Sequence, residues 1–253
     1  MDFTGKKVLV TGGSRGIGRA AVEAFLERGA AVAVNGRTED SVAQAIREMG
    51  GGDRLIPAPG DVAKVAGCEA AVAAAVDGLG GLDLLINSAG VGHGASIEDS
   101  DEALWDETLD VNLKGTFFCI KAALPALRKA SLGAIVNLAS DAGLIGEHRL
   151  TVYCASKGGV VNMTRAMALD LAPEVRVNCV CPGYVDTDMV RRDGIEKSHD
   201  PLAAEQKVVD YAPMKRMRTP QEIAMAIVYL ASDEARFVTG SALAIDGGSS
   251  AGR

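Results

Sequence analysis

Short apolar runs alternate with longer helical patterns along the whole of this 253-residue chain. This alternation limits the possible folds more than any other feature of the sequence. Seven runs have the length and composition of buried strands. They are residues 6–11, 31–35, 54–59, 82–87, 133–140, 175–180 and 242–246. No Pro- or Gly-rich linker divides the chain, so we expect residues 1–253 to form a single domain.

The stretches between these runs are amphipathic or rich in alanine, and each is long enough for a crossover helix. They are residues 16–28, 39–49, 64–79, 100–130, 151–171 and 219–231. Crossover helices join parallel strands, and right-handed crossovers place helices on both faces of the sheet. The pattern therefore predicts an α/β fold with a doubly wound, seven-stranded parallel sheet, whose ligand crevice lies beyond the carboxyl ends of the strands.

The composition agrees with such a core. Hydrophobic residues make up 48% of the chain but aromatic residues only 4%, and there are 30 glycines. A core of this kind is built from Val, Leu, Ile and Ala, with backbones packed close together.

Residues suited to binding or catalysis follow the first six strands in turn, where the fold places its crevice. They are Gly12, Arg37, Asp61, Asn87, Ser140 and Pro182. Residues 186–217 break the alternation with the charged stretch RRDGIEKSHDP. We predict that this segment is a mobile flap over the substrate.

Charge and the N-terminal residues argue against two classes of partner. The net charge is −7, whereas binding to a nucleic-acid backbone depends on clustered Lys and Arg. The chain begins MDFTGKKVLV, without the apolar stretch of a signal peptide. We therefore expect neither nucleic acid nor membrane as a partner, and a cytoplasmic location.

Cysteine and histidine give no sign of a disulfide framework or a metal site. The five cysteines are odd in number and include no CxxC pair, which suits a reducing compartment. The three histidines are scattered, and none is in HExxH spacing. We expect no catalytic metal.

A glycine-rich turn follows the first run, in the stretch TGGSRGIG at residues 11–18. Gly12, Gly16 and Gly18 lie where a tight turn into a helix brings backbone N–H groups against a pyrophosphate. An ordinary strand-to-helix loop is the alternative interpretation. Directly after the first strand of a parallel sheet, however, such a turn is typical of nucleotide binding.

The end of the second run indicates which nucleotide. Dehydrogenases that use NAD carry an acidic residue there for the ribose 2′-hydroxyl, whereas this chain has Asn35, Gly36 and Arg37. Arg37 and Arg15 can supply charge-assisted hydrogen bonds to a 2′-phosphate. The alternative is two solvated surface arginines, but two arginines at this end favour NADP(H) over NAD(H).

Tyr153 and Lys157 open the stretch YCASK at residues 153–157 and lie four residues apart, on one face of a predicted helix. A free tyrosine has a pKa near 10, so only about one in a thousand is ionised at pH 7. A neighbouring ammonium poises such a phenol for proton transfer.

The chain resembles the short-chain dehydrogenase/reductase family along essentially its whole length. The resemblance rests on TGGSRGIG, NSAG at 87–90, DVNLKG at 110–115, Ser140, YCASK and PGYVDTDM at 182–189, in the family's order and spacing. KRMRTPQEIA, ASDEARFVTG and IDGG look most like the 3-oxoacyl-[acyl-carrier-protein] reductases and their sugar- and alcohol-oxidising relatives. The resemblance implies a Rossmann-type domain.

It also implies catalytic roles. Tyr153 is expected to be the general acid in reduction, and Lys157 to lower its pKa and hold the nicotinamide ribose. Ser140 is expected to donate to the substrate carbonyl. Asn112 is expected to anchor a water that links Lys157 to solvent, although a buried amide bonded to backbone is an alternative reading.

A larger set of residues is expected, on the same resemblance, to contact the cofactor. Beyond Tyr153 and Lys157, the set is Gly12, Ser14, Arg15, Gly16, Ile17, Gly18, Arg37, Asp61, Val62, Asn87, Ala89, Gly90, Pro182, Gly183, Val185 and Thr187.

The leading hypothesis is an NADP(H)-dependent enzyme that reduces a ketone, either a 3-oxoacyl thioester or a small carbonyl compound. Oxidation of a sugar, polyol or other secondary alcohol is the alternative. An acidic carrier protein would need a basic patch, of which Arg128 and Lys129 supply half, while Pro173 and Glu174 occupy the other half. A non-catalytic nucleotide sensor or a purely structural protein fits less well, because all four catalytic positions are present. Small apolar faces at 100–130 and 151–171 predict a homotetramer or homodimer.

Overall fold

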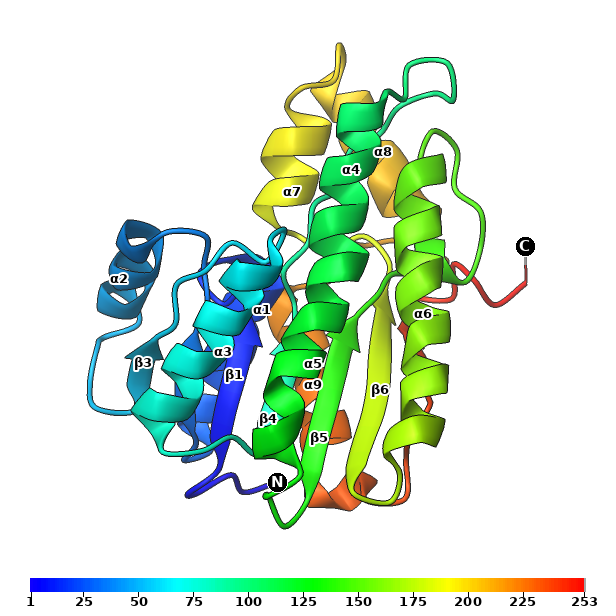
Figure 1. The fold of residues 1–253 in the computed structure, drawn as a ribbon. Helices are drawn as coiled ribbons and strands as arrows, with labels where there is room; N and C mark the ends of the chain where they lie inside the picture. The colour runs from blue at the N-terminus through cyan, green and yellow to red at the C-terminus, as the bar shows by residue number, and fades with distance from the viewer. Residues whose placement is uncertain (253) are drawn as a thin grey trace.

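The computed structural model describes residues 1–252, apart from the side chain of residue 193, and shows one sheet of seven parallel strands (Figure 1). The predicted fold class is confirmed. The strands are β1 (Lys7–Thr11), β2 (Ala31–Val34), β3 (Leu55–Pro57), β4 (Leu84–Asn87), β5 (Gly133–Leu138), β6 (Val175–Pro182) and β7 (Ala242–Ile245). Their order in the sheet is β3-β2-β1-β4-β5-β6-β7.

The direction of winding reverses at β1, which lies between β2 and β4. Val10 of β1 is in register with Val34 of β2 on one side and with Ile86 of β4 on the other. Loops that leave the carboxyl ends of β1 and β4 therefore diverge to opposite faces of the sheet. A crevice outside these ends is the usual ligand site of such sheets.

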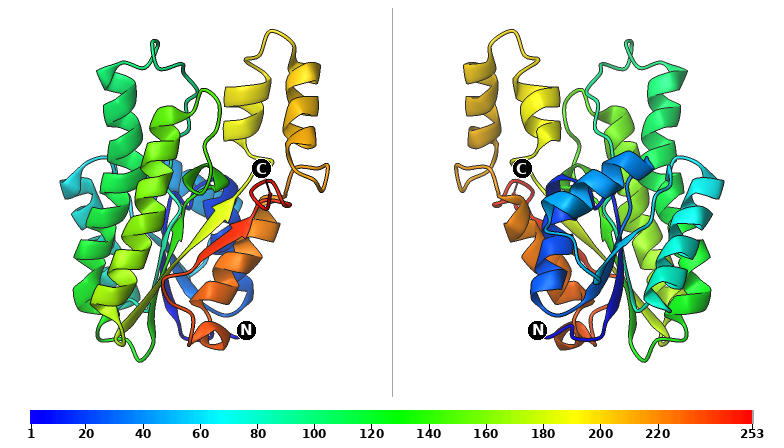
Figure 2. Two further views of the ribbon diagram at one scale, coloured as in Figure 1. Left: turned by 90° about the vertical axis from the view of Figure 1, so that its right-hand side faces the viewer. Right: turned by 90° about the vertical axis from the view of Figure 1, so that its left-hand side faces the viewer.

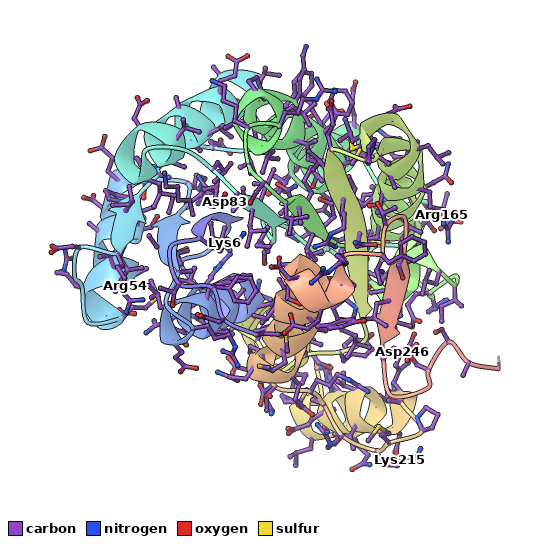
Figure 3. All side chains as sticks on the ribbon, turned by 90° about the horizontal axis from the view of Figure 1, so that it is seen from below. Lys6, Arg54, Asp83, Arg165, Lys215 and Asp246 are labelled. Carbon is purple, nitrogen blue, oxygen red and sulfur yellow. The ribbon has the colours of Figure 1, made fainter. Side chains whose placement is uncertain are left out.

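Helices cover both faces of the sheet, which Figure 3 shows from below as a layer between two helical layers. One face carries α1 (Gly16–Glu27) and α9 (Pro220–Ala231), which pack against each other, and α2 (Glu39–Glu48) lies beside β3. The other face carries α3 (Val65–Leu79), α5 (Gly115–Leu127) and α6 (Thr151–Leu171). The predicted helix over 100–130 consists of α4 (Glu102–Leu109), a π-helical stretch (Asp110–Lys114) and α5.

Residues 186–217 contain helices that the sequence did not predict. After α7 (Asp188–Val190) and a π-helical stretch (Arg191–Ile195) comes α8 (Pro201–Tyr211), and these helices stand above the sheet in Figure 2. The N-terminus of α8 is capped by Asp200, whose Oδ1 accepts from the N–H of Ala203 at 3.0 Å. Pro201 follows at the first helical position, where its missing N–H costs nothing.

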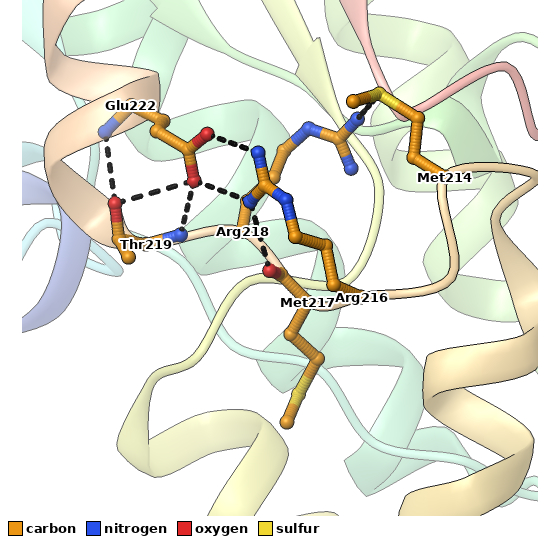
Figure 4. Close-up of polar contacts among 6 residues, drawn as sticks. All are labelled: Met214, Arg216, Met217, Arg218, Thr219 and Glu222. Atoms are coloured by element: carbon orange, nitrogen blue, oxygen red, sulfur yellow. Dashed lines mark hydrogen bonds and ion pairs between the residues drawn. The ribbon is translucent and has the colours of Figure 1, made fainter.

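The two ends of this flap segment are fastened together. Val185 and Arg218 form an isolated parallel bridge, in which Asp186 N donates to Arg218 O at 2.7 Å. Just beyond the segment, Thr219 and Glu222 form a capping box at the start of α9, and Arg216 donates to both oxygens of Glu222 (Figure 4). The flap therefore leaves and rejoins the domain at one fixed point.

Across residues 1–252, the structure contains no helix that is both long and apolar enough to span a membrane.

Candidate active site

The glycine turn after β1 forms a cradle that side chains would fill. A Cβ on Gly12 would lie 2.8 Å from Cα of Ala89, and one on Gly18 would lie 2.2 Å from the carbonyl oxygen of Gly12. Gly12 and Gly16 also have positive φ angles, of 63° and 55°. Only glycine permits this conformation and this closeness without strain. The backbone N–H groups at the start of α1 are thus accessible to an anionic group.

A cleft of about 720 Å³ extends from this turn across the carboxyl ends of the strands. It is lined by eighteen of the twenty residues that the sequence singled out. These are Gly12, Ser14, Arg15, Gly16, Ile17, Gly18, Arg37, Asp61, Val62, Ala89, Gly90, Ser140, Tyr153, Lys157, Pro182, Gly183, Val185 and Thr187. The two others, Asn87 and Asn112, do not line it.

At one end of the cleft lie Arg15 and Arg37, both exposed. Neither side chain forms a hydrogen bond or ion pair with another described residue, so both guanidinium groups are available to a ligand. Asn35, in contrast, is buried: its Nδ2 donates to Ala58 O at 2.8 Å, and its Oδ1 accepts from Gly12 N at 3.3 Å. This end of the cleft therefore offers cations, and the residue at the end of β2 turns its side chain away.

Tyr153, Lys157 and Ser140 meet near the middle of the cleft. Lys157 Nζ lies 5.7 Å from the centre of the Tyr153 ring and donates to Leu138 O at 2.9 Å. The Ser140 hydroxyl lies 3.1 Å from Oδ1 of Asp141 and 3.4 Å from Pro182 O. Residues from β5, α6 and the end of β6 thus converge on one point.

Burial governs the ionisation of these groups. It raises the pKa of Tyr153 to about 12, an effect that the Ser140 hydroxyl partly offsets, and it lowers the pKa of Lys157 to about 8. The sequence argument had the ammonium lowering the pKa of the phenol. In the protein alone, desolvation is the largest cause of the shift. The lowering by Lys157 stays a prediction. At neutral pH Tyr153 is a protonated acid and most Lys157 side chains are charged.

Asn112 is buried in the π-helical stretch, and its amide groups are occupied. Its Nδ2 donates to Val91 O at 2.9 Å and to Ser156 Oγ at 3.0 Å, and its Oδ1 accepts from Val91 N at 2.9 Å. Ser156 Oγ in turn donates to Tyr153 O at 2.8 Å. Asn112 thus joins the loop after β4 to the helix that carries Tyr153. This is the geometry of the buried, backbone-bonded amide, and the water relay stays a prediction.

Asn87 faces the sheet and not the cleft. Its Nδ2 donates to Oδ1 of Asn137 at 2.9 Å, and its Oδ1 is buried without a partner among the described residues. Any contact between Asn87 and a cofactor would have to use its backbone.

The other end of the cleft contains polar residues that the sequence did not single out: Asp141, Glu147, Tyr184 and Tyr211. Tyr211, the last residue of α8, donates to Oε2 of Glu147 at 2.9 Å. Its ring meets that of Tyr184 edge to face, with centroids 5.0 Å apart. The only sequence signal for Asp141 was its position next to Ser140. Tyr211 and Glu147 are 64 residues apart in the sequence, so no local sequence pattern predicts their contact.

Asp141 also connects the site to the C-terminal residues. Asp246, labelled in Figure 3, follows β7 and accepts from the N–H groups of Gly248 and Ser250 at 2.9 and 2.8 Å. This turn brings Ser249 to Asp141, where its Oγ donates to Oδ2 at 3.0 Å. The loop that carries Ser140 is therefore held from the end of the chain.

Comparison with known proteins identifies relatives of the whole chain. Residues 12–250 match the family model described as Enoyl-(Acyl carrier protein) reductase. The 2-(S)-hydroxypropyl-CoM dehydrogenase 3 of Xanthobacter autotrophicus is 39% identical, over 96% of each chain. The NADP-dependent (R)-specific alcohol dehydrogenase of Lentilactobacillus kefiri is 37% identical, also over 96% of each. A solved structure from Brucella melitensis, titled short-chain dehydrogenase/reductase SDR:Glucose/ribitol dehydrogenase, superposes with a TM-score of 0.88, at 34% identity over 98% of each chain.

Proposed function

Because this chain belongs to the short-chain dehydrogenase/reductase family, and is thus an oxidoreductase that acts on secondary alcohols or ketones, we propose that it prefers NADP(H) to NAD(H). The observation that carries the preference is the pair Arg15 and Arg37, exposed at one end of the cleft, whose guanidinium groups have no partners among the described residues. No carboxylate stands at the end of β2 to repel a phosphate. The glycine cradle suits the pyrophosphate.

The residues of the cleft divide the chemistry between them. When bound, the nicotinamide cofactor supplies or accepts the hydride. In reduction Tyr153 gives its phenolic proton to the carbonyl oxygen as that oxygen gains negative charge, and the Ser140 hydroxyl donates a hydrogen bond to the same oxygen. The ammonium of Lys157 stabilises the phenolate that results. In oxidation the Tyr153 proton moves the opposite way.

A supporting role falls to Asn112. Through Ser156 it fixes the first turn of α6, on which Tyr153 lies, against the loop after β4. We assign Asn112 to positioning, and a proton path from Lys157 to solvent through bound water remains part of the proposal.

Reduction of a ketone is the leading hypothesis for the direction of catalysis, and oxidation of a secondary alcohol is the alternative. A carrier-bound thioester is the less favoured substrate. Arg128, one of the two residues that supply half of the basic patch considered above, forms an ion pair with Glu174 at 2.8 Å, so its charge is neutralised locally. An acidic carrier protein would have to displace this pair.

The test is a comparison of catalytic efficiency with the two cofactors on a shared substrate. The expected result is a kcat/KM at least tenfold higher with NADPH than with NADH. A protein that uses NADH equally well or better would show that Arg15 and Arg37 are surface charges only.

A further inference from the structure

The half of the cleft beyond Tyr153 has a distinct chemical character. Its apolar side chains come largely from the flap, where Ile195, Val208 and the neighbouring Ala204 face inward. Its polar groups are carboxylates and phenols. Among the residues that the structure describes, Lys157 is the only cation that lines this half.

Glu147 is positioned as a hydrogen-bond acceptor. Tyr211 donates to its Oε2 at 2.9 Å, while Oε1 has no partner among the described residues. Burial and the carboxylates of Asp141 and Glu147 raise the pKa of Tyr211, so Tyr211 remains a donor at neutral pH. Because that donor holds one carboxylate oxygen in place, the other is oriented and available to a ligand.

The charges of this half exclude some ligands. Neither Asp141 nor Glu147 has an ion-pair partner in the described part of the chain, whereas Asp188 is paired with Arg192. An anionic substrate would meet these carboxylates with only Lys157 in compensation, and Lys157 is already bonded to Leu138 O. Like charges at close range in a partly shielded cleft oppose binding.

We propose that the substrate is a neutral secondary alcohol with at least one further hydroxyl group, a diol or polyol, or the corresponding hydroxyketone. The hydroxyl that does not react donates to Oε1 of Glu147, and the carbinol carbon lies at Tyr153 and Ser140. This inference rests on the proposed function, because it presupposes that Tyr153 and Ser140 bind the reacting oxygen. It deepens that proposal by naming the group that selects the substrate.

Three alcohols that share a four-carbon chain separate the possibilities: butan-2-ol, butane-2,3-diol and 3-hydroxybutanoate, each oxidised with NADP⁺. The wild-type protein should have its highest kcat/KM with the diol and its lowest with the carboxylate. Glu147→Gln should lower the ratio of kcat/KM for diol over butan-2-ol about tenfold, because a neutral amide accepts less strongly than a carboxylate. The same variant should raise the relative kcat/KM for 3-hydroxybutanoate.

Two further variants make the test specific. Tyr211→Phe removes the donor that orients Glu147 and should shift both ratios in the same direction but less. Glu69→Gln, a loss of an exposed carboxylate on α3 outside the cleft, should leave both ratios unchanged. Titration of each variant with NADPH, followed by nicotinamide fluorescence, shows that the cofactor site is intact.

The outcomes distinguish this inference from the proposed function. If Glu147→Gln leaves the ratios unchanged, or the wild-type protein prefers 3-hydroxybutanoate, the polyol inference is wrong while the enzyme's activity stands. If the wild-type protein oxidises none of the three and reduces none of the matching ketones, both the inference and the proposed function fail.

Discussion

The ammonium of Lys157 lies 5.7 Å from the centre of the Tyr153 ring, one helical turn away on the same face of α6. Both side chains have shifted pKa values, upward to about 12 for the phenol and downward to about 8 for the ammonium. Burial is the main cause of each shift, and each favours the neutral form. At neutral pH the phenol is therefore protonated, while the ammonium is close to the pH at which it loses its proton. Each state gives a kinetic prediction.

The first prediction concerns the proton donor. Tyr153→Phe removes the phenolic proton at the meeting point of Ser140 and Lys157, so turnover should fall by roughly 10²- to 10⁴-fold. Affinity for NADPH should change little, because the ring is retained. Steady-state rates beside a fluorescence titration measure the two quantities. Near-native turnover would mean that another group donates the proton.

The second prediction concerns pH. Since burial lowers the pKa of Lys157 to about 8, the positive charge is present below pH 8 and disappears as the pH rises past that value. The kcat/KM for NADPH, which reports the free enzyme, should fall up to tenfold per pH unit above about pH 8. Lys157→Arg keeps its charge at all these pH values. Its lower activity should therefore lack this alkaline fall, whereas a fall common to both proteins would assign it to another group.

The third prediction concerns cofactor choice. Arg15→Gln and Arg37→Gln should each weaken NADPH binding about tenfold, since each removes a charge-assisted bond at an exposed site, and should leave NADH binding nearly unchanged. Arg47→Gln on α2 is the matched control, because Arg47 is exposed and does not line the cleft. Equal losses for NADH and NADPH would point to a general charge effect.

Gly36→Asp combined with a neutral residue at position 37 would be expected to move the cofactor preference further, from NADPH toward NADH. The structure shows the cost of that design. A Cβ on Gly36 would lie 3.0 Å from Cγ2 of Val42 and 3.1 Å from Oγ of Ser41. These neighbours would have to move by a few tenths of an ångström, so the arginine substitutions are the cleaner experiment.

The fourth prediction concerns the anchor of the flap. Thr219→Ala removes the side-chain cap of α9 shown in Figure 4 and should lower the free energy of unfolding by about 1 kcal/mol. Denaturant titration measures this loss. Thr219→Ser, which keeps the capping hydroxyl, should lose much less. Equal destabilisation by both would assign the effect to packing of the Thr219 methyl group.

The fifth prediction concerns assembly. Phe237 is fully exposed and Leu169 of α6 is 84% exposed, which is costly for side chains of this size in a monomer. Light scattering at micromolar concentration should give the mass of a dimer or tetramer. Phe237→Ser and Leu169→Ser, made separately, should show which surface is buried by lowering that mass. A monomeric wild-type protein would remove the prediction.

Most of the fold could be predicted from the sequence because each strand has a recognisable local pattern. Runs such as 82–87 are short, apolar and bounded by turn residues, and the structure places β4 within that run. The helix α8 was not predicted because the residues around it in the sequence are charged. Its own signals were nevertheless present: Asp200 and Pro201 form a helix start, and Ala204, Val208 and Tyr211 share one helical face.

The candidate site was predictable where neighbours in sequence are neighbours in space, as with Tyr153 and Lys157. It was not predictable where the fold alone creates the contact. Glu147 and Tyr211 meet because the flap returns over the loop after β5, and neither residue type is unusual in its own segment. Asn87 shows a second limit of the sequence pattern, because the last residue of a strand can point either to the cleft or into the sheet. Its contact with a cofactor stays a prediction.

The hydrogen bond from Ser249 to Asp141 makes the C-terminal residues part of the support of the loop that bears Ser140. Met1 lies at the opposite end of the sheet, as Figure 2 shows. A purification tag or a surface tether at the C-terminus is therefore expected to strain the hydrogen bond that holds the loop bearing Ser140. A tag at the N-terminus would be remote from that bond. For immobilised preparations, we expect attachment through the N-terminus to retain more specific activity than attachment through the C-terminus.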